Sequence, residues 1–530
     1  MTEQPTDQPQ GDTPLPKKRG LLRSSAVTGS MTFVSRILGL VRDVVLARAF
    51  GPGDGADAFF LAFKIPNFLR RLFAEGAFNQ AFVPVLSEYR NQRSRAEIRE
   101  LIDAVAGYLG TVLLLITVAV VAAAPFVAWP IAYGFTSDPE KFDLFVHMLR
   151  INFPYLLLIS LTAFCGAILN SYDRFAVPAL TPALLNLSLI GSALLLSPYF
   201  AQPEVALAWG VLLAGISQLL FQLPFLVRMQ LMPRPRLIRQ HEGVSRIVKL
   251  MIPAMFGVSV SQINLLFDTF IASLLVAGSV SWLYFSERLM DLPLGIFAVA
   301  VATVVLPSLS RRHADRSVED FAALLDWAFR LILLIAVPAS LALVLLAEPI
   351  IITLFGSDNF NTNDVIQVTK SLQAYSLGLV AFMAIKVFAP GFYSRQDTRT
   401  PVRIGIVAMV VNMVLNVILV FVFDMAHTGL ALATSLAAFL NAGLLLAGLR
   451  KEGVFQFQAG WLVFALRVAF ANTMMCLFLV WLAGDWQQWL VWSTWHQAGV
   501  MALLCFGGMA LYALMLFLTG MRVAHFRRHA

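Results

Sequence analysis

The sequence predicts an all-α polytopic membrane protein with about fourteen transmembrane helices. Of its 530 residues, 58% are hydrophobic and 13% are charged, and the mean hydropathy is +0.75. A soluble domain carries about 25% charged residues. Apolar runs long enough to cross a bilayer, such as Leu109 to Phe126 and Leu331 to Leu346, recur along the chain. These observations exclude a soluble enzyme and leave no room for a large soluble domain.

Each expected helix is an apolar stretch bounded by polar or helix-breaking residues. The predicted ranges are 27–50, 57–82, 103–129, 146–171, 178–199, 204–228, 246–275, 280–309, 320–347, 367–391, 401–424, 428–449, 461–483 and 497–520. An even number of spans puts both termini on the same side of the membrane.

Basic residues gather in alternate loops, which predicts the orientation. The basic side includes Arg93, Arg95, Arg99, Arg234, Arg236, Arg311, Arg395, Arg450 and Arg527, whereas the opposite loops offer little beyond Lys141, Arg150 and Lys370. Because cytoplasmic loops are enriched in Arg and Lys, both termini are expected in the cytoplasm. The net charge of +8 is divided among these loops, so it does not form the continuous basic face of a nucleic-acid-binding protein.

The N-terminal segment and the cysteines carry little functional signal. Residues 1–24 begin with a stretch rich in Pro, Gln, Thr and Asp, which predicts a disordered cytoplasmic tail. They lack the apolar stretch of a signal peptide, which argues against a cleaved signal sequence. Cys165, Cys476 and Cys505 lie inside apolar segments without metal-type spacing, which indicates packing roles.

An internal repeat predicts two lobes. Pro84 corresponds to Pro307, Pro178 to Pro401, and Leu207 to Leu430, each pair at a shift of 223 residues within similar local sequences. We therefore expect two pseudo-symmetric bundles of about six helices, a transporter architecture, followed by two additional helices. The predicted division is an N-lobe at 25–228, a cytoplasmic linker at 229–245, a C-lobe at 246–450, and the last two helices with a cytoplasmic tail at 451–530.

Charged residues interrupt the first two expected helices and the eighth. They and their polar neighbours are Ser35, Arg36, Arg42, Asp43, Arg48, Asp57, Lys64, Asn67, Arg70, Arg71, Glu75, Ser281, Glu287, Arg288 and Asp291. A charge at the bilayer centre costs about 2.5–3.5 kcal/mol, so these side chains should face the bundle interior or a water-filled cavity. Basic residues outnumber acidic ones in the set, which favours a cationic cavity for a polyanion such as a diphosphate. The alternative is a set of ion pairs that lock the bundle.

A second polar group lies in the predicted C-lobe. Asp268, Asn412, Asn416 and Thr434 could supply an all-oxygen site for a hard cation such as Na⁺. Hydrogen bonding between helices is the alternative use of these side chains. The sequence has no phosphate-binding loop and no nucleophile motif. We therefore expect a transporter driven by a gradient or the membrane potential, and not an enzyme.

Several motifs resemble those of the MurJ (MviN) family of lipid II flippases. They are Ser35-Arg-Ile-Leu-Gly-Leu-Val-Arg-Asp43, Ala56-Asp-Ala-Phe-Phe60, Lys64-Ile-Pro-Asn-Phe-Leu-Arg-Arg-Leu-Phe-Ala-Glu-Gly-Ala-Phe78, the segment from Ser281 to Met290, and Ala389 to Asp397. The resemblance covers nearly everything after the first 20 or so residues. The family belongs to the multidrug/oligosaccharidyl-lipid/polysaccharide exporter superfamily, whose two six-helix lobes agree with the internal repeat.

The resemblance implies that the protein moves lipid II, the undecaprenyl-diphosphate-linked peptidoglycan precursor, across the bacterial cytoplasmic (inner) membrane by alternating access. It places substrate-binding roles on Arg36, Arg42, Asp57, Arg70 and Arg288, with Ser35, Asn67, Ser281 and Asp291 as neighbours. It places a sodium site on Asp268, Asn412, Asn416 and Thr434, with an asparagine at 416 where the family pattern suggests a carboxylate. The last two helices would help to form a groove for the polyprenyl tail. Lipid II, membrane lipids and other cell-wall synthesis proteins are the implied partners, without nucleic acid.

Three other functions compete with this hypothesis. A cation-coupled drug exporter, or an exporter of another lipid-linked oligosaccharide, would share the superfamily, but a drug exporter should have an acidic, aromatic-rich cavity and twelve spans. A membrane glycosyltransferase or polymerase should carry acidic residues near a large outer loop. A scaffold of the cell-wall machinery would tolerate neutralisation of Arg36, Arg70 and Arg288.

Overall fold

The computed structural model describes residues 18–71, 77–295, 309 and 318–522, and its regular elements are helices. The first half contains α1 (Lys18–Phe50), α2 (Asp54–Arg70), α3 (Asn79–Gln92), α4 (Arg95–Ala122), α5 (Ala124–Ile131), η2 (Tyr133–Ser137), α6 (Pro139–Asn152), α7 (Tyr155–Ser171), α8 (Ala176–Gly191), η3 (Ser192–Leu196), η4 (Ser197–Tyr199) and α9 (Val205–Arg228). The second half contains α10 (Glu242–Ser273), α11 (Ser279–Pro293), α13 (Val318–Leu345), α14 (Ala347–Phe355), α15 (Thr362–Tyr393), α16 (Arg399–Val417), η6 (Ile418–Val422), α17 (Ala426–Lys451), α18 (Trp461–Ala483), α19 (Trp486–Val491) and α20 (Thr494–Leu518).

Most predicted helices are present, and the differences have local causes. Within the predicted helix 57–82, α2 ends at Arg70 and α3 begins at Asn79; Arg71, Ala77 and Phe78 are π-helical, and residues 72–76 lie outside the described part of the chain. α4 begins well before the predicted residue 103, since Ser94 and Glu97 form a capping box in which each side chain accepts a bond from the other's backbone N–H. α1 begins at Lys18, so the prediction of a disordered tail is wrong for residues 18–24, which follow the last proline of the segment. The rest of that tail lies outside the described residues.

The chain is a multi-pass membrane protein. Within the described residues, ten helical segments are long and apolar enough to span a bilayer, so the count of fourteen is not confirmed. The ten do not include α1, α2, α10 and α11. Of these, α2 and α11 have only 17 and 15 residues. α1, α2 and α11 also contain the charged residues singled out from the sequence, so their composition departs from that of an ordinary span.

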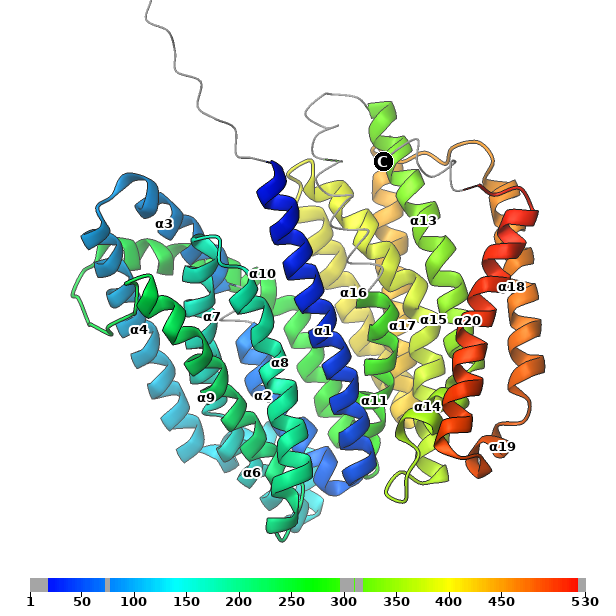
Figure 1. Cartoon of the computed structure of the whole chain (residues 1–530), viewed down its shortest axis with the longest axis horizontal. Helices are drawn as coiled ribbons and strands as arrows, with labels where there is room; N and C mark the ends of the chain where they lie inside the picture. The colour runs from blue at the N-terminus through cyan, green and yellow to red at the C-terminus, as the bar shows by residue number, and fades with distance from the viewer. Residues whose placement is uncertain (1–17, 72–76, 296–308, 310–317, 523–530) are drawn as a thin grey trace, which may run out of the picture.

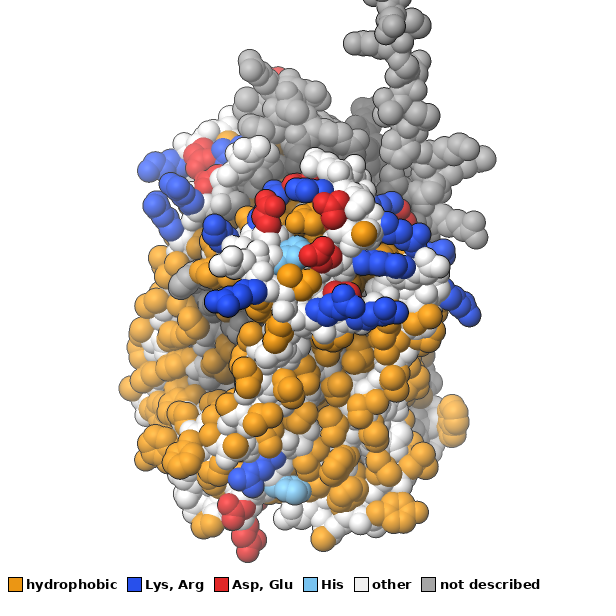
Figure 2. All heavy atoms as spheres, turned by 90° about the vertical axis from the view of Figure 1, so that its left-hand side faces the viewer, with side chains coloured by type: hydrophobic (Ala, Val, Ile, Leu, Met, Phe, Trp, Pro, Cys, Tyr) orange, Lys and Arg blue, Asp and Glu red, His pale blue; other side chains and the backbone are white. Residues whose placement is uncertain are grey.

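One end of the molecule is rich in arginine, and we call it the arginine-rich end. α1 begins and α20 ends there (Figure 1). Figure 2 shows Lys and Arg side chains concentrated along this end, above a broad hydrophobic surface. Exposed members include Arg90, Arg93 and Arg246. The hydrophobic surface has the character expected of a lipid-facing band.

The helices of the two halves meet in the middle of the molecule. α1 packs against α8 within the first half, and α11 packs against α15 within the second half. α2 contacts α11 across the boundary, where the ring of Phe60 stacks on the ring of Tyr284 at 3.9 Å between centroids. α10 begins against the first half, where Arg246 pairs with Glu88 at 2.7 Å, and its later part contacts α16 of the second half. The charged helices α1, α2 and α11 therefore face the bundle interior.

Candidate functional site

A cavity of about 400 Å³ lies between the two halves. Its walls come from α1, α8, α11 and α15, so each half supplies part of the lining. The lining residues are Ser35, Arg36, Gly39, Leu40, Arg42, Asp43, Asn186, Arg288, Asp291, Leu292, Leu294, Gly295 and Lys386. Four basic side chains and two carboxylates thus share this space, which gives the described wall an excess of positive charge.

Arg42 is held by a network of hydrogen bonds that joins the halves. Its Nη2 lies 2.6 Å from Oδ1 of Asp43, and Nη1 donates to Oδ1 of Asn186 at 3.0 Å. The hydroxyl of Tyr284, on α11, accepts from Arg42 at 3.0 Å and donates to Asp43 at 2.9 Å. Arg42 is 6% exposed and Asp43 is 3% exposed. Arg42 and Asp43 therefore form a buried ion pair, which is the alternative considered from the sequence, in which ion pairs lock the bundle.

Arg36 and Arg288 differ from Arg42. Within the described residues, neither guanidinium has a carboxylate within ion-pair distance. Arg288 lies over the ring of Tyr284, with its Cζ 5.0 Å from the ring centroid, in a cation–π contact. The end of Arg36 lies against Gly295, where an added Cβ would be 1.6 Å from Nη1. Position 295 therefore has to be glycine for Arg36 to reach across to the other half.

Two lining residues were missed in the sequence analysis. Lys386 lies on α15 and Asn186 lies on α8. Both are polar residues inside apolar stretches, so the reasoning applied to α1 and α2 could have found them. Asn186 binds Arg42 through its oxygen and donates to the backbone oxygen of Ser35 at 3.0 Å. Lys386 adds a cation on the side of the second half.

The structure does not bring every predicted site residue to this cavity. Ser35, Arg36, Arg42, Arg288 and Asp291 line it, whereas Asp57, Asn67, Arg70 and Ser281 are not among its described lining residues. Nε of Arg70 donates to Oδ1 of Asn67 at 3.2 Å. Both residues lie near the end of α2, next to residues 72–76, which lie outside the described part of the chain.

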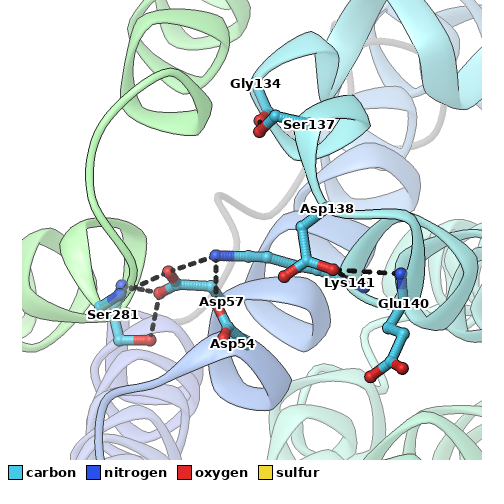
Figure 3. Close-up of polar contacts among 9 residues, drawn as sticks. Asp54, Asp57, Gly134, Ser137, Asp138, Glu140, Lys141 and Ser281 are labelled. Atoms are coloured by element: carbon cyan, nitrogen blue, oxygen red, sulfur yellow. Dashed lines mark hydrogen bonds and ion pairs between the residues drawn. The ribbon is translucent and has the colours of Figure 1, made fainter.

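Asp57 and Ser281 join the two halves at the end opposite the arginine-rich end (Figure 3). One carboxylate oxygen of Asp57 accepts from the backbone N–H of Ser281 at 2.9 Å and from its hydroxyl at 2.7 Å. The other accepts from the backbone N–H of Gly278 at 2.7 Å. Asp57 is 1% exposed. We call Asp57, Gly278 and Ser281 the latch.

A second contact lies at the same end. Nε and Nη2 of Arg48 donate to the backbone oxygens of Leu354 and Thr353, each at 2.9 Å. In return, the amide of Asn359 donates to the backbone oxygen of Ala49 at 2.9 Å. The halves are therefore fastened together at this end by two separate groups of hydrogen bonds.

Three of the four predicted sodium ligands lie together. The amides of Asn412 and Asn416 donate to Oδ1 of Asp268 at 3.2 and 2.5 Å. The oxygens of both amides are buried without a hydrogen-bond partner. The hydroxyl of Thr434 donates within its own helix, to the backbone oxygen of Leu430 at 2.9 Å. The unpartnered amide oxygens and the carboxylate are donors suited to a hard cation, whereas the amide N–H groups serve hydrogen bonding between helices.

An apolar groove of about 680 Å³ runs between α13 and α18. Its lining is almost wholly hydrophobic and includes Leu333, Val337, Trp461, Phe464 and Val468. The groove has the chemistry of a site for a hydrocarbon chain.

Comparison with known proteins identifies the family. The family profile described as "Lipid II flippase MurJ" matches residues 46–498. The "Probable lipid II flippase MurJ" of Vibrio cholerae is 48% identical over 510 residues, covering 95% of this chain and 97% of its own length. The proteins of Haemophilus influenzae (44% identical; 93% and 99% covered) and Burkholderia cenocepacia (41%; 96% and 99%) are similar over the same extent.

Solved structures agree with these matches. A structure titled "Lipid II flippase MurJ, inward closed conformation" superimposes with a TM-score of 0.75 and 27% identity, covering 92% of this chain and 98% of that one. An inward-facing MATE transporter of the MOP superfamily superimposes with a TM-score of 0.67 at 16% identity, over 81% of this chain and 98% of that one, and shares the fold. The chain belongs to the MurJ family of lipid II flippases.

Proposed function

We propose that this protein is a lipid II flippase of the bacterial inner membrane, which carries the diphosphate-linked head group from the cytoplasmic to the outer leaflet. Membership of the MurJ family supports this function. The observation that carries the proposal is the cavity between the halves, where Arg36 and Arg288 have no carboxylate within ion-pair distance among the described residues and basic side chains outnumber carboxylates. A pyrophosphate offers the oxygen acceptors that such guanidinium groups bind in pairs.

The cavity residues have different parts in this proposal. Arg36 and Arg288 grip the diphosphate, and Lys386 adds a point charge from the second half. Arg42 instead holds the wall in shape, because its N–H groups are engaged by Asp43, Asn186 and Tyr284. The polyprenyl tail stays in an apolar setting, for which the groove between α13 and α18 is suited. No covalent step is needed, so the protein acts as a transporter and not as an enzyme.

In an alternating-access transporter, one end of the molecule opens to the cytoplasm and the other end opens to the outer side of the membrane. The arginine-rich end is cytoplasmic by the distribution of positive charge, which places both termini in the cytoplasm. The latch and the contacts of Arg48 then close the outer end. Release of the head group outside requires these bonds to break while the two predicted lobes, 25–228 and 246–450, rock against each other. The predicted linker, 229–245, and the C-terminal region, 451–530, need not take part in the closure.

Sodium is our candidate coupling ion. Asp268, Asn412 and Asn416 would hold it, because these side chains lie together between α10 and α16 and the two amide oxygens have no hydrogen-bond partner. When bound, Na⁺ would supply a positive charge that draws these two helices together. Contacts with other cell-wall synthesis proteins remain a prediction.

The test is translocation of lipid II in cells, scored by accessibility of the head group to an enzyme added outside. Arg36→Ala and Arg288→Ala should each abolish transport at equal protein level, because both residues line the cavity. Loss of transport in the Arg288 variant would place the phosphate grip between the halves. Normal accessibility after depletion of the wild-type protein would refute the function, and normal transport by both variants would refute the cationic-cavity mechanism.

A further inference from the structure

A lysine that the function above does not use lies directly behind the latch. Nζ of Lys141, in the first turn of α6, lies 2.6 Å from Oδ1 of Asp54 and 3.4 Å from Oδ2 of Asp57. It also lies 4.3 Å from the centroid of the Phe135 ring. Lys141 is 7% exposed. A buried lysine requires compensating partners, and here each of them comes from the first half of the chain.

The partners of Asp57 divide between the two halves. Its neutral donors, the N–H groups of Gly278 and Ser281 and the hydroxyl of Ser281, belong to the second half. Its nearby cation belongs to the first half (Figure 3). Closing the latch therefore removes a carboxylate from water against donors that carry no formal charge. Burying a carboxylate in this way is costly unless a cation accompanies it.

A second carboxylate increases this requirement. Asp54 lies three residues before Asp57, so both face the same side of α2. Without a cation between them, closure would bury the charge of Asp57 beside the charge of Asp54, whose side chain stays 53% exposed. Lys141 contacts both carboxylates, and its position above Phe135 adds a cation–π contact. The ammonium thus separates the two charges and keeps Asp57 directed at the second half.

We propose that Lys141 is a positioning residue for the latch: its charge allows Asp57 to close the outer end of the transporter. The proposal rests on the function above, because it assumes that the outer end opens and closes. Neutralising Lys141 should shift the protein towards a state that is open on the outer side. Since removal of one partner of a buried ion pair is strongly unfavourable, the closed-to-open ratio should fall by about tenfold or more.

The experiment measures the separation of the halves by electron–electron double resonance of the full chain in nanodiscs. Spin labels at the exposed positions Asp143→Cys and Thr362→Cys, with Cys165, Cys476 and Cys505 replaced, report the outer end. Lys141→Met should broaden the distance distribution towards longer distances and reduce lipid II transport. Lys141→Arg should restore both. Lys370→Met, which removes an exposed lysine of α15, is the matched control and should change neither.

A double-substitution cycle separates this role from ordinary packing. If Lys141 acts through the charge of Asp57, Lys141→Met should add little further opening to Asp57→Asn. An additional effect of full size in that background would show that Lys141 only packs, and would overturn the proposal. Lys141→Gln serves in place of Lys141→Met if that variant does not fold. An unchanged distance distribution in the neutral variants, with wild-type lipid II transport intact, would also overturn it, whereas absence of transport by the wild type would overturn the proposed function.

Discussion

Gly295→Ala tests whether the reach of Arg36 across the cavity is needed for transport. In the structure an alanine Cβ at this position would lie 1.6 Å from Nη1 and 2.5 Å from Cζ of Arg36. The guanidinium must therefore move, and because it ends a flexible side chain, it can do so without disturbing the backbone. We expect the variant to fold normally and to lose the contact of Arg36 with the substrate.

The size of the effect follows from the bonds that are lost. A hydrogen bond to a charged group contributes about 1.5–3 kcal/mol, so the transport rate should fall by about 10- to 150-fold. The assay is lipid II accessibility in cells, with protein level and thermal unfolding measured alongside. Gly405→Ala is the matched control, because nothing lies within 4 Å of a Cβ at that position.

The double variant that combines Gly295→Ala with Arg36→Ala gives the most decisive test. If Gly295→Ala acts by displacing Arg36, it should cause no further loss in the Arg36→Ala background. Normal transport by Gly295→Ala at normal stability would refute the argument that Arg36 has to lie against residue 295. An equal loss in both backgrounds would show that residue 295 acts on something other than Arg36.

Three further predictions test other parts of the structure. Asn186→Ala should reduce transport about tenfold at equal protein level, because it leaves a buried N–H of Arg42 without its acceptor. Asp326→Ala should lower the free energy of unfolding in detergent by about 1.5–3 kcal/mol, since this 3% exposed carboxylate accepts a 2.6 Å bond from the indole at the start of α18; an unchanged melting temperature would contradict this. The hydrogen bond from Arg246 lowers the pKa of Glu88, which lies outside the spans, below its ordinary 4.5, so the pair stabilises the protein above that pH and loses this effect as the pH falls through the lowered pKa. Glu88→Gln should therefore lower Tm at about pH 7, and this change in Tm should shrink as the pH falls below the lowered pKa of Glu88; a change that stays the same at every pH would contradict the ion pair.

The sequence alone determined the membrane class, most of the helices and the presence of charged groups inside the bundle. These properties depend on local composition, because a span needs about 20 apolar residues and an intramembrane charge is expensive wherever it lies. The repeat and the family motifs are also local patterns. The start of α4 could also have been predicted, since the capping box of Ser94 and Glu97 can be recognised in the sequence.

Only the tertiary structure decided which partners those charged groups have. Asp57 meets Ser281 across 224 positions of sequence, and Arg42 meets Tyr284 across 242. Such partners are chosen by how the two halves pack, and no periodicity within one helix specifies them. That is why Asp57 and Ser281, expected in the substrate cavity, lie in the latch, and why Arg42 is locked while Arg288 has no carboxylate within ion-pair distance among the described residues. The sequence therefore gives the chemistry of each side chain, but the role of that side chain depends on distances that only the folded structure sets.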